Sequence, residues 1–505
     1  SNNNLAYYSQ KCGTTKNYCL AAPGGDAITG DLIYSTVQND DNHEKDKNGA
    51  AYGYMQGTSM AAPVVTGSVA LLMGAYPHLT SQQIVEILFT TATDLGAKGV
   101  DEVYGHGLIN LDAATSPIGY LSFDFLDNKQ QNTYSASALN LSKSVSAKIL
   151  NILPAKFTVF DEYDRGFEIN TSSLFADTSK QRRHLFENDF KAFMSHGKKT
   201  VKTGNNVSFA FNSSVSGNDI YSPYGFIGVD YNLSNKFGVQ AFYSENTILN
   251  RGEIFTRTEQ NPFISMDNAF GLGFNYKSDK TSFKLDYTGG KNNFFEDEEN
   301  SDLYDNHMNA ITSELSYNFT DNFSVSSILG NLSEKSSVLG MIGNDTFDIG
   351  DSNTYFTGMK VTFNPTDRLS LSGVYYRGYT NTSANNNVFS MSDIESESIA
   401  LNATYKLTSK NNIGLDVYSP LRIVKGSTDI VLASGRHQTE NKIYLNKYHT
   451  SLKDTDREWD VSMFYNQQIK DDANFKTRFG VRFNPEHDAN AKPDYFGMFN
   501  LNFAF

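Results

Sequence analysis

The sequence predicts a multidomain protein in which a mixed α/β segment is followed by a transmembrane antiparallel β-barrel. Three observations support this fold class. A glycine-framed serine precedes an apolar helical stretch in "YGYMQGTSMAAPVVTGSVALLM" (52–73). From about residue 206 onward, segments of strictly alternating apolar and polar residues follow one another. The chain then ends on alternating aromatic residues, "FGMFNLNFAF" (496–505).

Length, composition and charge limit the classes of protein to which this sequence can belong. The 505 residues suffice for several domains, and a formal net charge of −14 argues against a nucleic-acid partner. No apolar run of about 18 residues is evident, so no transmembrane helix is expected. The start, "SNNNLAYYSQ", has no signal-peptide pattern, and we expect further chain upstream of it. Cys12 and Cys19 lie close together, which favours a local disulfide in an oxidising compartment over two free thiols.

Residues 1–115 have the pattern of an α/β segment. "NYCLAAPG" (17–24) predicts a short buried strand that ends in a Pro-Gly turn. One helix is expected from Ser59 to about Tyr76. A second is expected in "LTSQQIVEILFTTA" (79–92), with Ser81 as its N-cap. "VYGHGLINLDAA" (103–114) predicts a glycine turn and the start of a short helix.

Residues 116–205 form a linker region. "PAKFTVFDEYDRGFEIN" (154–170) predicts one or two short strands. The stretch 179–194, "SKQRRHLFENDFKAFM", predicts a polar helix with only a thin apolar stripe. Two interpretations stay open for it: a helix inside a polar barrel lumen, or a helix on the surface of the N-terminal domain.

Residues 206–505 predict the barrel. In "AFGLGFNYK" (269–277), aromatic and aliphatic residues occupy one face and glycine or polar residues the other. Fourteen such segments can be counted, and 411–434 is either one long strand or a strand with an extension; an even total of 12 or 14 is expected. Connections alternate between short and long, which is typical of outer-membrane barrels rather than of a water-soluble β-domain, the alternative. The residues expected to face lipid are Phe270, Leu272, Phe274, Phe479, Val481, Phe499, Leu501 and Phe503, and those expected to face the lumen are Lys277, Lys284, Arg478 and Arg482.

Ser59 is the candidate nucleophile. A serine hydroxyl needs a base to become nucleophilic, but a helix start supplies unsatisfied N–H donors that can hold an oxyanion. Gly57 permits a sharp bend ahead of it, and Pro63 occupies the first turn, where a missing N–H costs little. The alternative is that Ser59 serves only as an N-cap.

The stretch "GTSMAAP" (57–63) is similar to the nucleophile motif of the subtilisin-like serine peptidases. The flanking "LAYYSQKCG" (5–13) and "YGHGLINLDAA" (104–114) resemble the segments around that motif. The resemblance covers residues 1–115. It implies that Ser59 is the nucleophile and that its own backbone N–H belongs to the oxyanion hole. The motif residues around Ser59 are Gly57, Thr58, Met60, Ala61, Ala62 and Pro63.

The sequence departs from the family in one respect. The family's Asp and His precede the serine in their own motifs, and neither motif is present in these residues. His43 lies in the charged loop "DDNHEKDKN" (40–48) and is not expected to act as the base, while His78 and His106 are expected to be structural. We therefore expect the C-terminal part of a peptidase domain that is inactive by itself.

A subtilisin-like segment ahead of a barrel resembles the subtilisin-type autotransporters. The resemblance implies a bacterial outer-membrane location, with the peptidase at the cell surface or released. Its partners would be protein or peptide substrates, outer-membrane lipid, and the assembly machinery that recognises the C-terminal Phe505. No cofactor or metal is expected; the acidic "FEDEEN" (295–300) is only a weak candidate for structural calcium. The alternative function is an adhesin or binding module on an inactive subtilisin fold.

Overall fold

The computed structural model divides the chain into two compact units. Unit 1 contains residues 1–134, 157–169 and 433–446, and unit 2 contains residues 135–156, 170–432 and 447–505. The structure describes residues 4–38, 44–45, 48–122, 134, 139–141, 143–175, 199–203, 206–214, 222–246, 257–291, 307–343, 347–384, 388–437, 440, 442–470 and 473–503. The predicted helix 179–194, His43, the stretch 295–300 and Phe505 lie outside these residues.

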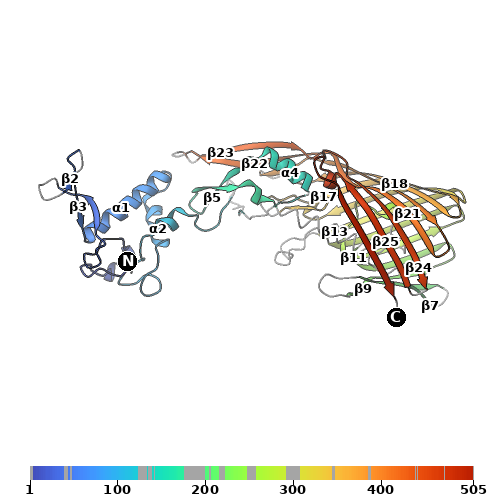
Figure 1. Ribbon diagram of the computed structural model, residues 1–505, viewed down its shortest axis with the longest axis horizontal. Helices are drawn as coiled ribbons and strands as arrows, with labels where there is room; N and C mark the ends of the chain where they lie inside the picture. The colour runs from blue at the N-terminus through green and yellow to red at the C-terminus, as the bar shows by residue number, and fades with distance from the viewer. Residues whose placement is uncertain are drawn as a thin grey trace. The chain divides into compact units, whose positions relative to one another are not determined.

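Unit 1 is built around three helices and a small sheet (Figure 1). The helix predicted from Ser59 is confirmed as α1 (Thr58–Ala75), and it is followed by α2 (Ser81–Thr90) and α3 (Leu111–Thr115). The antiparallel sheet has the order β1-β3-β2 and is formed by β1 (Ile33–Thr36), β2 (Glu44–Lys45) and β3 (Ala51–Met55). Its strand β3 leads directly into α1. The core of the helices consists of Leu72, Leu79, Ile84, Ile87, Leu88 and Ala114.

Helix α1 is apolar on most of its surface. Over its 18 residues the mean hydropathy is 1.4, so it is the one helix in the described ranges that could span a membrane by length and composition. The expectation that no such run exists is therefore wrong, because the valines, leucines, methionines and alanines of this helix raise the mean above the contribution of its serines, threonines and glycines. Leu71 is 48% exposed and Met73 52% exposed. A helix apolar all round belongs in a protein interior or a membrane, so α1 carries surface suited to burial.

The N-cap of α2 is Thr80, and the prediction of Ser81 is wrong. Thr80 has extended backbone angles, and its hydroxyl accepts a hydrogen bond from the backbone N–H of Gln83 at 3.3 Å. The Gln83 side chain returns the contact by accepting from the Thr80 N–H at 2.9 Å. This reciprocal pair is a capping box, which the glutamine three residues after Thr80 could have revealed.

The strand predicted at residues 17–24 is also wrong. The chain there leaves a 3-10 helix, η1 (Gly13–Tyr18), and makes only single bridges, from Leu20 to Gly105 and from Ala21 to Leu108. No ladder forms, because the bridge of Leu20 is antiparallel, that of Ala21 is parallel, and their partners Gly105 and Leu108 are not adjacent.

A buried arginine joins the later part of unit 1 to the helices. The two strands predicted in residues 154–170 are confirmed as β5 (Lys156–Phe160) and β6 (Gly166–Asn170). Between them, the fully buried Arg165 pairs with the fully buried Asp161 at 2.6 Å. Arg165 also donates to the carbonyl oxygens of Ala114 at 2.5 Å and Ser116 at 2.8 Å, at the end of α3. A buried charge needs such partners, because an unpaired one is strongly destabilising.

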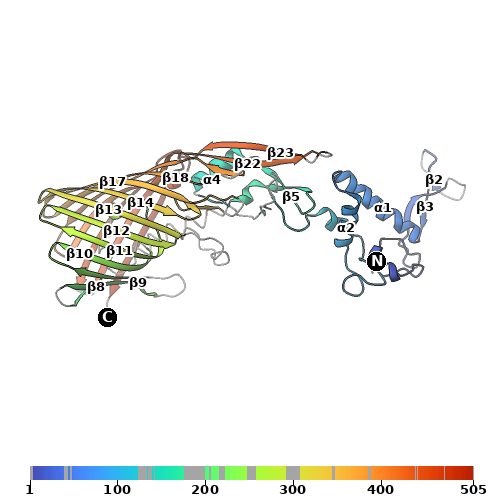
Figure 2. The same cartoon turned by 180° about the vertical axis from the view of Figure 1, so that it is seen from behind.

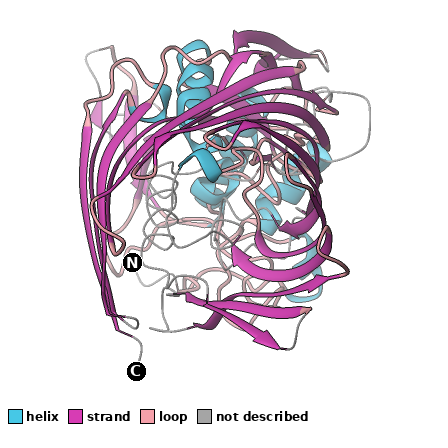
Figure 3. Ribbon diagram, turned by 90° about the vertical axis from the view of Figure 1, so that its right-hand side faces the viewer, coloured by secondary structure: helices cyan, strands magenta, loops and turns pink. Residues whose placement is uncertain are grey.

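Unit 2 is dominated by one antiparallel sheet of fifteen described strands (Figures 2 and 3). Fourteen of them begin at or after residue 207, and a short strand precedes them. The described pairings run from the first strand to the last, and the sheet curves strongly, which fits a β-barrel (Figure 3). No pairing between the two end strands is recorded among the described residues. The strands are β7 (Lys199–Thr203), β8 (Val207–Ser214), β9 (Ser222–Asn232), β10 (Phe237–Asn246), β11 (Asp267–Lys277), β12 (Thr281–Lys291), β13 (His307–Thr320), β14 (Phe323–Glu334), β17 (Ser352–Thr366), β18 (Leu369–Thr382), β20 (Ile394–Lys406), β21 (Asn411–Lys425), β24 (Trp459–Lys470), β25 (Ala473–Phe483) and β26 (Asp494–Phe503).

Connections alternate in length as the sequence predicts. The strands at one end join through tight turns, such as residues 233–236 and 278–280, and at the other end through long segments, such as residues 247–266. The uncertain stretch 411–434 is a strand with an extension. β21 ends at Lys425, Gly426 follows with a φ of 150°, and β22 (Ser427–Arg436) continues into another sheet. That second sheet includes β19 (Phe389–Met391) and β23 (Ile443–Ser451).

The remaining short elements of the described part belong to unit 2. They are β4 (Leu139–Asn140), α4 (Lys143–Ile152), η2 (Thr171–Leu174), η4 (Arg257–Glu259), β15 (Ser337–Val338), β16 (Met341–Gly343) and η5 (Pro485–His487). Strands β15, β16 and β4 form a three-stranded sheet.

The two faces of the large sheet differ in chemistry. On the outer face, Phe270 is 50% exposed, Leu272 59%, Phe479 47%, Phe499 63% and Leu501 52%. Direct cross-strand partners share a face, and the register pairs Leu272 with Tyr287 and Gly273 with Asp286. The opposite, inner face therefore carries polar groups. Among the predicted lumen residues, it places Lys284 opposite Asn275 and Arg478 opposite Phe464, with Arg478 bound to Asp416 at 2.9 Å.

A buried polar contact ties together two connections at the long-loop end. His487 Nδ1 accepts a hydrogen bond from the backbone N–H of Glu458 at 2.9 Å, and its Nε2 then donates to the Leu421 carbonyl at 3.1 Å. Burial lowers the pKa of His487, which keeps the ring neutral. Burial, together with the negative charge of Asp460, raises the pKa of the Glu458 carboxyl to about 8.

Candidate functional site

The candidate site is the turn between β3 and α1. Gly57 occupies it with a φ of 145° and a ψ of 164°, a backbone conformation that residues with a Cβ rarely adopt. The N–H groups of Met60 and Ala61 both donate to the Gly57 carbonyl, at 3.0 and 3.3 Å, so the helical bonds begin there. The sharp bend predicted for Gly57 is therefore present, and it places Ser59 in the first turn of α1.

A second glycine segment supports this turn. The Gly57 N–H donates to the Gly24 carbonyl at 2.8 Å. A Cβ on Gly24 would lie 2.8 Å from the Gly57 carbonyl oxygen and 2.9 Å from the hydroxyl of Tyr8, so only glycine fits. The Tyr8 hydroxyl donates to the Gly25 carbonyl at 2.6 Å. The Pro-Gly end of the stretch 17–24 thus acts as the brace of the nucleophile turn.

Gln56 fixes the turn from its other side. Its side-chain oxygen accepts from the backbone N–H of Ala27 at 2.6 Å, and its amide nitrogen donates to the Tyr7 hydroxyl at 2.7 Å. Sequence reasoning did not single out Gln56, Tyr7 or Gly24 as site residues. Only Gln56 adjoins the motif; the partners of all three residues lie more than 25 residues away along the chain, so no local pattern could reveal these contacts.

Ser59 is exposed at the start of α1. Within the described part of the chain, no hydrogen bond is recorded for its hydroxyl or for the N–H groups of Thr58 and Ser59. These N–H groups lie at the positive end of the helix and are free to receive an anionic oxygen. The arrangement can therefore hold a negatively charged intermediate at Ser59, whereas the proton of Ser59 has no acceptor among the described residues.

Two of the three described histidines of unit 1, His78 and His106, have partners other than Ser59, and the third, His437, accepts a hydrogen bond from the backbone N–H of Glu440 at 3.1 Å. His106 contacts the Asn17 carbonyl through Nε2 at 3.1 Å, and its ring stacks on Phe89 with centroids 4.0 Å apart. His78 contacts the Tyr163 carbonyl at 3.4 Å, and burial lowers its pKa. Both therefore have the structural role that the sequence predicts.

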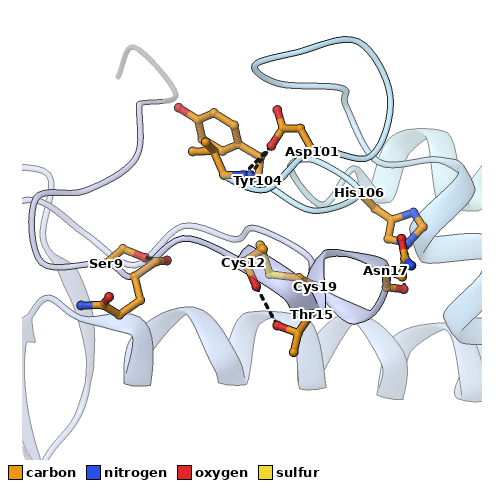
Figure 4. The surroundings of a disulfide bond; sticks show 10 residues. Ser9, Cys12, Thr15, Asn17, Cys19, Asp101, Tyr104 and His106 are labelled. Carbon is orange, nitrogen blue, oxygen red and sulfur yellow. Dashed lines mark hydrogen bonds between the residues drawn. A yellow bond between two sulfur atoms is a disulfide. The ribbon is translucent and has the colours of Figure 1, made fainter.

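A disulfide between Cys12 and Cys19 lies near the carboxylate of Asp101 in unit 1 (Figure 4). Cys12 and Cys19 are joined in the disulfide that their spacing predicts. Beside it, Asp101 accepts backbone N–H bonds from Tyr104 and Val103, each at 2.7 Å, and from Ala97 at 2.8 Å. The bond from Tyr104 is the main cause of a lowered pKa for Asp101. Among the described residues, no cluster of His, Cys, Asp or Glu could hold a metal ion.

Comparison with known proteins shows what the segment around this site is similar to. Residues 1–107 match the model of the subtilase family, Peptidase_S8. Over 225 residues, the chain is 32% identical to serotype-specific antigen 1 of Mannheimia haemolytica, covering 44% of this chain and 20% of that protein. Over 123 residues it is 37% identical to the autotransporter lipoprotein NalP of Neisseria meningitidis serogroup B, covering 24% of this chain and 10% of that one. Residues 1–107 are thus similar to the subtilases, and the chain is similar to the subtilisin-like autotransporters.

Two further similarities were found. An extracellular serine protease of Serratia marcescens is 42% identical over 128 residues, which is 23% of this chain and 12% of that protein. The chain spans a fifth or less of the length of the relatives named here. Among solved structures, the outer-membrane protein OmpT of Vibrio cholerae, with loop L8 deleted, aligns with 61% of this chain and 88% of its own at 12% identity and a TM-score of 0.35.

Proposed function

We propose that this chain belongs to a serine endopeptidase displayed at the bacterial cell surface, in which Ser59 is the nucleophile. The observation that carries the proposal is the exposed Ser59 on the first turn of α1, behind a Gly57 turn that Gly24 braces. An attacking hydroxyl at this place would leave the substrate oxygen beside the N–H of Ser59, as an oxyanion hole requires. The match of residues 1–107 to the subtilase family supports this role.

The base must come from outside the described residues. His78 and His106 are bound to carbonyl groups elsewhere in unit 1. The peptidase would therefore be completed by an Asp and a His on segments that adjoin α1. The apolar and largely exposed surface of α1, with Leu71 and Met73, supports such a completion because it is suited to burial under further chain.

The sheet from β7 to β26 would be the outer-membrane anchor. Its outer face exposes aliphatic and aromatic side chains such as Leu272 and Phe499, and its inner face carries ion pairs such as Asp416 with Arg478. Backbone groups in lipid must all be paired, which a closed ring of strands achieves. The partners would be protein or peptide substrates, outer-membrane lipid and the barrel-assembly machinery, with no cofactor.

Labelling by a fluorophosphonate probe tests the proposal. We expect the probe to label Ser59 when the chain is expressed together with the upstream peptidase segments, and Ser59→Ala to abolish both labelling and peptide hydrolysis. The matched control is Ser68→Ala, a serine on the same helix that is buried and donates to the Val64 carbonyl at 2.8 Å. If the wild type is surface-exposed and folded but never labelled, the adhesin or binding-module alternative on an inactive subtilisin fold replaces the peptidase.

A further inference from the structure

The connection between β10 and β11 does not simply leave the sheet. Its described part, residues 257–266, lies against the inner face, where Thr258 is 2% exposed, Phe263 4% and Met266 1%. A surface loop would expose its side chains to water. These residues are instead as buried as the core of unit 1, so the segment is packed inside the sheet.

An aromatic contact anchors the second half of this segment, at Phe263. The ring of Phe263 stacks on Phe356 of β17, with centroids 4.7 Å apart and planes at 8°, and meets the edge of Tyr376 of β18 at 6.4 Å. A Cβ on Gly378 would lie 2.5 Å from the Phe263 ring, so the absence of a side chain there creates the seat for the ring. The rest of the apolar cluster is contributed by the inner faces of β11, β13, β14, β18 and β20, through Ala269, Met308, Ala310, Ile328, Leu332, Val374 and Ala400.

Polar contacts anchor the first residues of the segment, at Thr258 and Glu259. The hydroxyl of Thr258 lies 2.9 Å from the hydroxyl of Ser372 on β18, and Glu259 forms an ion pair with Lys360 on β17. Gly378, which seats Phe263, is six residues from Ser372 on the same strand (378 − 372 = 6). At a rise of roughly 3.4 Å per residue, the segment follows the inner face for about 20 Å. Ser372 is also only three residues from Leu369, where β18 begins at its tight turn, so the segment reaches deep into the sheet.

The other part of the inner face is different. On β21, β24 and β25, the ion pairs Asp416–Arg478 at 2.9 Å and Asp460–Arg482 at 3.1 Å run along the inside. The inner surface over β13–β20 therefore carries the apolar cluster and the segment packed on it, with Lys360 paired to Glu259, whereas the surface over β21–β25 carries ion pairs between its own strands.

We propose that residues 257–266 form an internal constriction of the barrel, which blocks the side lined by β13–β20 and restricts passage to the charged side. The proposal uses the barrel described above but is independent of the peptidase. The contacts at both ends hold the segment in place, because moving it away from the sheet would expose Phe263 and Met266 and break the Glu259–Lys360 pair. The segment would exclude small hydrated ions and solutes from the side lined by β13–β20.

Ion conductance of the whole chain in planar lipid bilayers tests the constriction. Phe263→Glu places a charge in the apolar seat and should release the segment, with a several-fold rise in single-channel conductance. The matched control adds Thr258→Cys and Ser372→Cys, whose hydroxyl positions are close enough for a disulfide, in a background with Cys12→Ser and Cys19→Ser. Oxidation of this pair should return the conductance to the wild-type value, and reduction should raise it again.

A second readout makes every outcome decisive. Thiol labelling of Ser372→Cys by a membrane-impermeant reagent should be slow in the otherwise unchanged chain and fast with Phe263→Glu. If labelling accelerates while conductance stays constant, the segment is only a brace and the constriction is refuted. If neither changes, Phe263 does not hold the segment and the proposal also fails. A variant with residues 257–264 replaced by a glycine-serine linker covers the case in which the buried glutamate prevents folding, and heat-modifiable gel mobility reports barrel formation separately.

Discussion

Replacing Leu272 by Arg tests whether the outer face of the sheet meets lipid. Leu272 is the middle residue of the 11-residue strand β11 and is 59% exposed. Five residues separate it from either end of the strand (272 − 267 and 277 − 272), or roughly 17 Å along the strand at ~3.4 Å per residue. A strand tilted by about 40° reduces this to roughly 13 Å, half of an apolar band about 25 Å tall. Arginine at that depth should destabilise the barrel by roughly 2–4 kcal/mol.

The assay is reversible denaturant unfolding of the chain in lipid vesicles, with heat-modifiable gel mobility as the check of folding. The matched control is Leu233→Arg, since Leu233 is 56% exposed but lies in the tight turn after β9. Near the interface, the same substitution should cost only about 0–1 kcal/mol. Leu272→Phe, which keeps an apolar side chain, should also be mild. Equal losses at Leu272 and Leu233, or a sheet that stays folded and monomeric without detergent or lipid, would refute the reasoning that this face is embedded in lipid.

Three further predictions concern the two units. Residues 1–505 alone should not hydrolyse peptides, because no described base lies beside Ser59, whereas in the completed peptidase Ser59→Ala should lower kcat/KM by several orders of magnitude; probe labelling of residues 1–505 at the rate of the complete enzyme would contradict this. Peroxide should inactivate the complete enzyme by oxidising Met60 beside the nucleophile, and Met60→Ala should resist it; equal sensitivity of the two would exclude Met60 as the target. The Glu458 carboxyl has a pKa of about 8 when folded against 4.5 as the reference value, so the folded state binds the extra proton and stability should fall as the pH rises through this interval. Thermal melts across it should show a flatter profile for Glu458→Gln, and parallel profiles would argue that Glu458 ionises freely.

Local chemistry could be predicted from the sequence where the cause lies within a few residues. The helix from Thr58 to Ala75 and the bend at Gly57 follow from one contiguous motif. The alternating strands follow from a period of two, which holds wherever one face must be apolar and the other polar. The cap of α2 is equally local: Thr80 and Gln83 form it, and Thr80, not the predicted Ser81, has the glutamine at the required spacing.

Contacts between distant segments could not be predicted, because a linear pattern does not say which surface a loop will meet. Residues 17–24 have the composition of a strand, yet their role is to place Gly24 against Gly57. The connection after β10 shows the same limit more strongly. Phe263 in it has no periodic neighbours to mark it as buried, and only the folded sheet supplies the seat at Gly378 and the stacked ring of Phe356.

By itself, the sequence determined the serine at a helix start, the disulfide spacing and an outer face of aromatic and aliphatic residues, since each depends on neighbours along the chain. The tertiary structure alone decided that Gly24 braces the nucleophile turn, that Arg165 is buried with Asp161 against α3, and that residues 257–266 lie inside the sheet. The physical reason is common to all three: the free energy of each arrangement comes from burying a group against partners that are far away in sequence, and those partners exist as a surface only after the chain has folded.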